Sequence, residues 1–186
     1  MSPRNFYFNI RCLYLSTNLY LQNVPIFNKM NVGEKMEVFR KVPIFRDLKD
    51  DELYQILSLA EKKTYKPEEK IFSEGDKGDG FYIILKGEVR ISMILEGIGE
   101  ELLMLLREND YFGEMSLIDD QPRSANAISD KDTTCMFIEK KKFTDFIHSD
   151  IYIENKIINA FLKELSHRMR NTDKKMKNIL LLMKSF

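Results

Sequence analysis

Apolar residues recur at helical spacing early in the chain. Val32, Met36 and Phe39 are spaced to lie on one face of a first helix. A second helix is predicted to start in the polar segment 47–51 and to end near Lys62. The apolar residues of this second helix fall on one side, and they are Leu53, Ile56, Leu57 and Ala60. The opening section of the chain is therefore predicted to be helical.

The middle of the chain changes to the shorter spacing of β-strands. Residues 81–85 are a continuous apolar run of the kind found in buried strands, and residues 89–93 alternate between apolar and polar. Further strands are predicted at 102–106, around Ile128 and at 135–138. Turn-forming stretches separate the early strands, at 74–80, 86–88 and 95–99. Several short strands at this spacing predict a small closed or sandwiched antiparallel β unit.

A long helix is predicted for residues 150–186, which contain neither Gly nor Pro. Seven residues spaced alternately by three and four positions form a heptad stripe, called the seam below: Leu162, Leu165, Met169, Thr172, Met176, Ile179 and Met183. We expect the seam to pair with its own copy in a parallel homodimer. The alternative is that one chain lays this stripe on its own β unit.

Composition excludes several classes of function. The 29 basic residues balance the 29 acidic residues, so net charge does not call for a nucleic acid, an anionic membrane or an acidic substrate. Cys12 and Cys135 lack disulfide or metal-ligand spacing, which fits a reducing compartment, and we predict a cytoplasmic location. His148 and His167 have no second His or Cys nearby. We therefore expect neither a metal site nor a Ser-His-Asp catalytic site.

The first residues are predicted to be a poorly ordered leader. Segment 6–27 is rich in apolar and aromatic residues, but polar residues and Pro25 interrupt it, whereas a membrane-spanning helix needs about 20 mostly apolar residues. No uninterrupted apolar run precedes a cleavage site of small residues, so a signal peptide is not expected either. The predicted division of the chain is a leader at 1–29, a domain at 30–150 and a helix at 151–186.

Segment 111–127 carries residues suited to binding a phosphate beside a sugar. Gly113 permits close approach of the backbone, and a short helix beginning near Glu114 would point free amides at an anion. Arg123 adds a guanidinium fork that suits phosphate oxygens, and the Ser124 hydroxyl is a further donor. A carboxylate repels phosphate, but Glu114 could accept a hydrogen bond from a sugar hydroxyl. The alternative is that Glu114 and Arg123 form an ion pair with each other across a turn.

Taken together, several segments closely resemble the phosphate-binding cassette of cyclic nucleotide-binding domains and its surroundings. The resemblance covers roughly residues 40–175. Its motifs are PIF before the second helix, EGDKGDGFYIILKGEV across the early strands, YFGEMSL and PRSANA. This combination is specific, whereas Phe-Gly-Glu alone would be weak evidence.

The resemblance implies an α+β fold, an antiparallel, jelly-roll-like β-roll with flanking N-terminal helices and a long C-terminal helix. It also implies a ligand, cAMP or cGMP, and no further cofactor. Glu114 would then bind the ribose 2′-hydroxyl and Arg123 the cyclic phosphate. The remaining cradle residues would come from the two cassette motifs, and they are Gly113, Met115, Ser116, Ser124 and Ala125.

Two residues bear on the choice of base. In similar kinase regulatory subunits the position of Ser124 is often Ala for cAMP, and cGMP-dependent kinases often have Thr there, so Ser124 leaves the choice open. The segment RNTDKKM resembles the dimer helix of the catabolite activator family, in which the threonine that matches Thr172 reaches adenine. This favours cAMP. The alternative for Thr172 is a hydrogen bond to its own helix backbone.

Three functions from different classes follow from this interpretation. The first is a regulatory cyclic nucleotide sensor that signals through its C-terminal helix to an unknown effector protein. The second is a ligand-free interaction module with the same fold. The third, an enzyme acting on nucleotides, is disfavoured because no nucleophile, metal set or general base accompanies the cradle. The activator family continues into a helix-turn-helix domain, for which this sequence leaves no room, so we do not expect DNA binding.

Overall fold

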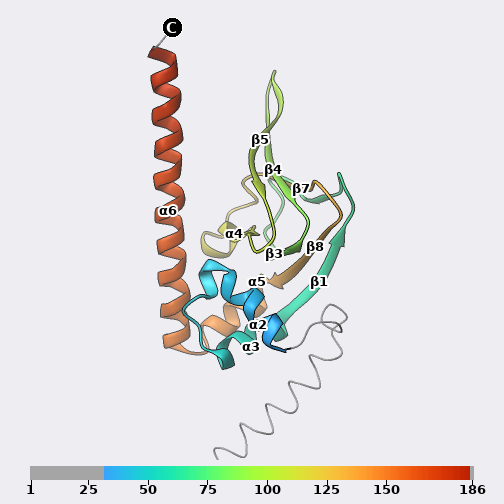
Figure 1. Cartoon of the computed structure of the whole chain (residues 1–186), viewed down its shortest axis with the longest axis vertical. Coiled ribbons are helices and arrows are strands. Elements are labelled where there is room, and N and C mark those ends of the chain that lie inside the picture. Colours follow the sequence, from blue (N-terminus) through green and yellow to red (C-terminus); the bar gives the residue numbers. More distant parts are fainter. Residues whose placement is uncertain (1–31, 185–186) are drawn as a thin grey trace, which may run out of the picture.

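The computed structural model describes residues 32–184, which fold into an antiparallel β-roll flanked by helices (Figure 1). The helices are α2 (Val32–Lys41), the short 3-10 helix η2 (Pro43–Phe45), α3 (Asp50–Leu59), α4 (Met115–Ile118), α5 (Lys140–Ile147) and α6 (Ile151–Lys184). The strands are β1 (Ala60–Tyr65), β2 (Lys70–Phe72), β3 (Gly80–Lys86), β4 (Val89–Leu95), β5 (Gly99–Leu106), β6 (Tyr111–Phe112), β7 (Asn126–Ser129) and β8 (Thr133–Glu139).

The strands form two four-stranded sheets. The first has the order β1-β8-β3-β6 and the second has the order β2-β7-β4-β5, and every recorded strand pair is antiparallel. Because β6 and β7 lie in different sheets, the segment between them crosses from one sheet to the other. This segment contains α4 and the cassette residues. Its first end is fixed by β6 in the first sheet and its second end by β7 in the second sheet.

Strand β3 is buried on both faces, which explains its continuous run of apolar residues. Phe81 and Ile83 belong to a core shared with the helices, whereas Tyr82 and Ile84 belong to the core inside the roll. Successive side chains of a strand point to opposite faces, so a strand between two apolar layers needs apolar residues at every position.

Helix α6 is buried against the body of the molecule along its first half. Ile153, Ile157 and Phe161 are buried against the helical core, and the Lys156 ammonium donates hydrogen bonds of 2.7 Å to both carboxylate oxygens of Glu52 in α3. The second half of α6 projects from the body of the molecule (Figure 1).

The seam is not covered by the β-roll of its own chain. Its apolar members are all exposed, from 39% for Leu165 to 70% for Met183. The alternative in which one chain covers its own stripe is therefore not the arrangement in this structure.

The predicted fold class is confirmed by the two antiparallel sheets, the flanking helices and the long C-terminal helix. The prediction that α3 extends to near Lys62 was wrong, because α3 ends at Leu59 and Ala60 pairs with Ile138 in the first sheet. Helix α5 was not predicted. The predicted leader, 1–29, lies outside the described residues. Among the helices that the structure describes, none is both long and apolar enough to cross a membrane.

Candidate functional site

The cassette turns sharply at Gly113, between β6 and α4. Gly113 has a φ of +80°, and a Cβ atom placed there would lie 2.6 Å from Nη1 of Arg123. Glycine is the residue that adopts this backbone conformation without strain, and here it also leaves room for the guanidinium. The turn therefore depends on Gly113 in two independent ways.

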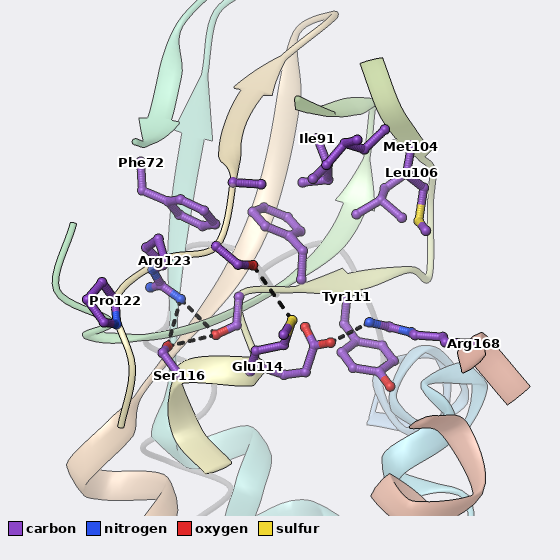
Figure 2. Close-up of a pocket in the computed structure, with 16 residues that line it drawn as sticks. Phe72, Ile91, Met104, Leu106, Tyr111, Glu114, Ser116, Pro122, Arg123 and Arg168 are labelled. Carbon is purple, nitrogen blue, oxygen red and sulfur yellow. Dashed lines mark hydrogen bonds and ion pairs between the residues drawn. The ribbon is translucent and has the colours of Figure 1, made fainter. Parts of the chain in front are cut away.

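A cavity of about 240 Å³ opens between the cassette, strands β4 and β5, and helix α6 (Figure 2). Seven of the eight site residues predicted from the sequence line it, and these are Gly113, Glu114, Met115, Ser116, Arg123, Ser124 and Ala125. Apolar side chains from the strands make up much of the rest of the lining: Phe72, Ile91, Leu103, Met104 and Leu106. The cavity thus joins a polar end at the cassette to an apolar end at the β4–β5 hairpin.

Arg123 is buried and held in a fixed orientation. Its Nη1 donates hydrogen bonds to the Gly113 carbonyl oxygen at 2.7 Å and to Ser116 Oγ at 3.1 Å. Its Nη2 donates to Asp79 Oδ1 at 2.7 Å and to the Gly80 carbonyl oxygen at 2.8 Å. The Nε–H is buried without a hydrogen-bond partner among the described residues. One donor of a buried cation is therefore left for another acceptor.

The loop before β3 supplies this support for Arg123. Gly78 lies so close to α4 that a Cβ atom there would be 2.1 Å from Ser116 Oγ. This packing places the next residue, Asp79, beside the guanidinium. The sequence placed the Gly-Asp-rich stretch in a turn and in one motif of the resemblance, but gave Asp79 no role in the site. The acidic residues of this stretch were the signal that a basic partner lay nearby.

Glu114 is 3% exposed and is not paired with Arg123. Its carboxylate instead forms an ion pair with Nη1 of Arg168 in α6 (Figure 2). The guanidinium of Arg168 also lies 5.1 Å from the centre of the Tyr111 ring. The two charged cassette residues thus have separate partners within the described chain, Asp79 for Arg123 and Arg168 for Glu114.

Arg168 also lines the cavity, although it was not among the site residues predicted from the sequence. Burial works against its charged form, but the carboxylates of Glu114 and Glu164 outweigh this, so the pKa of Arg168 is raised. The sequence did contain an indication that Arg168 belongs to the site. Arg168 lies one helical turn before Thr172, a predicted site residue, and so on nearly the same side of α6.

Thr172 and Ser124 occupy less enclosed positions. Thr172 is exposed, and its hydroxyl donates a hydrogen bond of 3.1 Å to the carbonyl oxygen of Arg168, the helix-backbone contact named above as an alternative. It does not line the cavity. Ser124 is also exposed, and its hydroxyl lies 3.7 Å from the sulfur of Met115 at the cavity edge.

The described residues contain no group of three or more His, Cys, Asp or Glu side chains placed to hold a metal ion. The polar groups of the cavity are two guanidinium groups, one carboxylate, hydroxyls and main-chain groups. Such a site can bind an anion and a hydroxyl side by side.

Residues 62–150 match the family model of the cyclic nucleotide-binding domain. The resemblance predicted from the cassette motifs is thereby confirmed for this segment, which is just under half of the chain.

The chain is also similar to parts of longer proteins. The chain is 33% identical over 116 residues to cGMP-dependent protein kinase 2 of Mus musculus, which is 61% of this chain and 15% of the kinase. It is 33% identical over 104 residues to the cyclic AMP receptor protein of Thermus thermophilus, which is 56% of this chain and 48% of that protein. The chain therefore spans less than half the length of either relative.

The solved structure of the Thermus thermophilus catabolite activator protein superimposes on this chain with a TM-score of 0.65 at 28% identity. The match covers 74% of this chain and 62% of that structure. The matched part of this chain is longer than residues 62–150, which fits an arrangement of β-roll and helices that the two structures share.

Proposed function

We propose that this chain is a cyclic nucleotide sensor that binds cAMP more strongly than cGMP and signals through α6 to a partner protein. One observation carries the proposal. Glu114 and Arg123 are both buried, line a single cavity, and are each held by a different partner rather than by each other. A buried acid and a buried base kept apart in one cavity suit a ligand that carries both an anion and a hydroxyl.

The phosphate would bind at the Arg123 end of the cavity. The unpartnered Nε–H of Arg123 supplies a charge-assisted donor, and Asp79 keeps the guanidinium in place without closing it off from the cavity. Main-chain groups of Gly113, Met115 and Ser116 would complete the cradle at the start of α4.

The sugar would bind at Glu114. The carboxylate accepts the hydrogen bond of the ribose 2′-hydroxyl, a neutral donor that can share the carboxylate with a cation. Arg168 offsets the negative charge of Glu114, which reduces the repulsion between this carboxylate and the nearby cyclic phosphate.

The base would then lie toward the apolar end of the cavity, with Thr172 on the α6 side. The preference for cAMP rests on the resemblance of the segment around Thr172 to the adenine-contacting helix. In the present arrangement the Thr172 hydroxyl is bound to its own helix, so reading the base requires α6 to turn toward the cavity.

The output of the sensor would pass through α6. The Arg168–Glu114 pair links this helix to the sugar-binding group, so a ligand hydroxyl that donates a hydrogen bond to Glu114 changes how tightly α6 is held. The exposed seam suits a homodimer, and the effector would read the dimer geometry in the cytoplasm. We propose no DNA contact by the domain itself.

Calorimetric titration of the full chain with cAMP and with cGMP tests the proposal. We expect heat from both nucleotides, with tighter binding of cAMP. The absence of heat at millimolar concentrations of either would favour the ligand-free interaction module, and cleavage of the nucleotide during the incubation would point to an enzyme.

A further inference from the structure

The hydroxyl group of Tyr111 is buried and has no hydrogen-bond partner among residues 32–184. Tyr111 is 3% exposed, lines the cavity and pairs with Ile83 in the first sheet. Burial raises the pKa of Tyr111, so its hydroxyl keeps the proton and remains a donor at neutral pH. A buried donor without an acceptor destabilises a fold, and such groups are rare in folded proteins.

The aromatic ring of Tyr111 has a role that does not need the hydroxyl. The Arg168 guanidinium lies 5.1 Å from the centre of the ring, a contact that a phenylalanine ring would also provide. The ring also packs in the core shared with the helices, where a phenylalanine would leave no polar group unpaired. The hydroxyl therefore adds only a cost to the present arrangement, which indicates that it is bonded in a second one.

A carboxylate of α6 is the acceptor that fits this hydroxyl. Arg168 offers only donors, so it cannot accept the hydroxyl proton. The carboxylates whose charges act on Tyr111 are those of Glu114 and Glu164. The hydroxyl end of Tyr111 points away from the Glu114 carboxylate, which is already paired with Arg168 (Figure 2). Glu164 is the acceptor that remains.

Glu164 can accept a further hydrogen bond. Its carboxylate accepts one of 3.2 Å from Nε of Arg168, and its side chain is 23% exposed. An ionised carboxylate has about four acceptor positions, so Glu164 can take the Tyr111 hydroxyl and still keep Arg168. The bond would be charge-assisted, and such bonds are stronger than those between neutral groups.

The proposed movement of α6 would bring Glu164 toward this hydroxyl. Glu164, Arg168 and Thr172 follow one another at intervals of four residues, so they lie on nearly the same side of the helix. Contact between Thr172 and the base requires α6 to turn toward the cavity, which Arg168 already lines. A turn in this direction also carries Glu164 toward β6, the strand of Tyr111.

We propose that Tyr111 is a positioning residue whose hydroxyl donates a hydrogen bond to the Glu164 carboxylate when a nucleotide binds and α6 turns. This inference rests on the proposed nucleotide binding and on the proposed movement of α6. The bond forms only in the bound arrangement, so it shifts the equilibrium toward that arrangement and strengthens nucleotide binding. The unpaired hydroxyl acts in the same direction, because it makes the free arrangement less stable.

Tyr111→Phe in the full chain tests the proposal. Calorimetry should show that cAMP binds about tenfold or more weakly, because the bound state loses a charge-assisted hydrogen bond. The urea midpoint of the chain without nucleotide should stay the same or rise, because no bond is lost there. Tyr152→Phe is the matched control, since it makes the same change at a side chain of α6 that is 75% exposed, and it should alter neither quantity. A lower urea midpoint for Tyr111→Phe, or an unchanged cAMP affinity, overturns the proposal.

Variants of Glu164 identify the acceptor. Tyr111→Phe should weaken cAMP binding much less in a Glu164→Ala chain than in the unaltered chain, because the acceptor is already gone. In a Glu164→Gln chain, which keeps a carbonyl oxygen, Tyr111→Phe should still weaken binding. Independent effects of Tyr111→Phe and Glu164→Ala overturn the proposal. An unaltered chain that binds neither cAMP nor cGMP overturns the proposed function and this inference with it, whereas binding that Tyr111→Phe leaves intact overturns this inference alone.

Discussion

Glu114 of the cassette and Arg168 of α6 form an ion pair across the cavity, and this pair joins the proposed sugar-binding group to the helix proposed to carry the signal. The Glu114 side chain is 4% exposed and that of Arg168 is 33% exposed. Replacing Arg168 would therefore leave a buried carboxylate without its cation.

We predict that Arg168→Ala lowers the free energy of unfolding by about 1–3 kcal/mol, because Glu114 loses its charged partner while remaining buried. Urea denaturation measures this change. Arg170→Ala is the matched control, since Arg170 is exposed on the same helix and, within residues 32–184, its side chain bonds only Ser166. It should change stability by less than about 0.5 kcal/mol. Equal effects of the two variants would mean that the Glu114 pair contributes nothing to stability.

Gly113→Ala should weaken nucleotide binding at least about tenfold, because the new methyl group would meet the Arg123 guanidinium in a backbone conformation that already disfavours side chains. Gly97→Ala is a close control. Gly97 has a φ of +77°, yet a Cβ atom there would have no neighbour within 4 Å. It should therefore share the backbone strain but bind nucleotide normally. Calorimetry on both variants checks the prediction, and equal affinities would show that Gly113 does not shape the site.

Thr172→Ala should weaken the binding of cAMP more than that of cGMP, because the proposed contact of its hydroxyl is with adenine. Thr172→Ser keeps the hydroxyl and should restore the preference. Competition binding with the two nucleotides measures the ratio. Equal losses for cAMP and cGMP would show that α6 does not read the base through Thr172.

Met176→Glu should weaken the homodimer by about 100-fold or more, about 2.7 kcal/mol, because two carboxylates would face each other in an apolar seam. Lys174→Glu reverses a charge on the same helix outside the seam and should have a much smaller effect. Analytical ultracentrifugation over a concentration series gives both constants. If both variants dissociated equally, the dimer would not use the seam.

Local patterns in the sequence predicted the long helix and five of the strands, β3, β4, β5, β7 and β8, but not β1, β2 or β6. The predicted elements are those in which burial on one or two faces produces a regular spacing of apolar residues. The run Phe81–Leu85 is such a case, since the helical core covers one face and the interior of the roll the other. The sequence pattern placed the end of α3 too late, because an apolar Ala60 fits the buried face of a helix as well as a buried position in a strand. Only its pairing with the distant Ile138 shows that Ala60 belongs to a strand.

The candidate site was predictable as far as it lies in one continuous segment. The cassette motifs brought together the residues from Gly113 to Ala125 that line the cavity. Asp79 and Arg168 were missed because their contacts with the cassette span 44 and 54 positions, and no local spacing reports a contact of that range.

The central claim is that Arg123 binds a cyclic phosphate while Glu114 binds the neighbouring sugar. Calorimetric titration of the full chain with cAMP, before and after Arg123→Ala, tests it most directly, with the exposed Arg46→Ala as control. We predict that Arg123→Ala weakens binding by about 2–4 kcal/mol, because the phosphate loses its charged donor, and that Arg46→Ala leaves it unchanged. An affinity that Arg123→Ala does not alter would contradict the account.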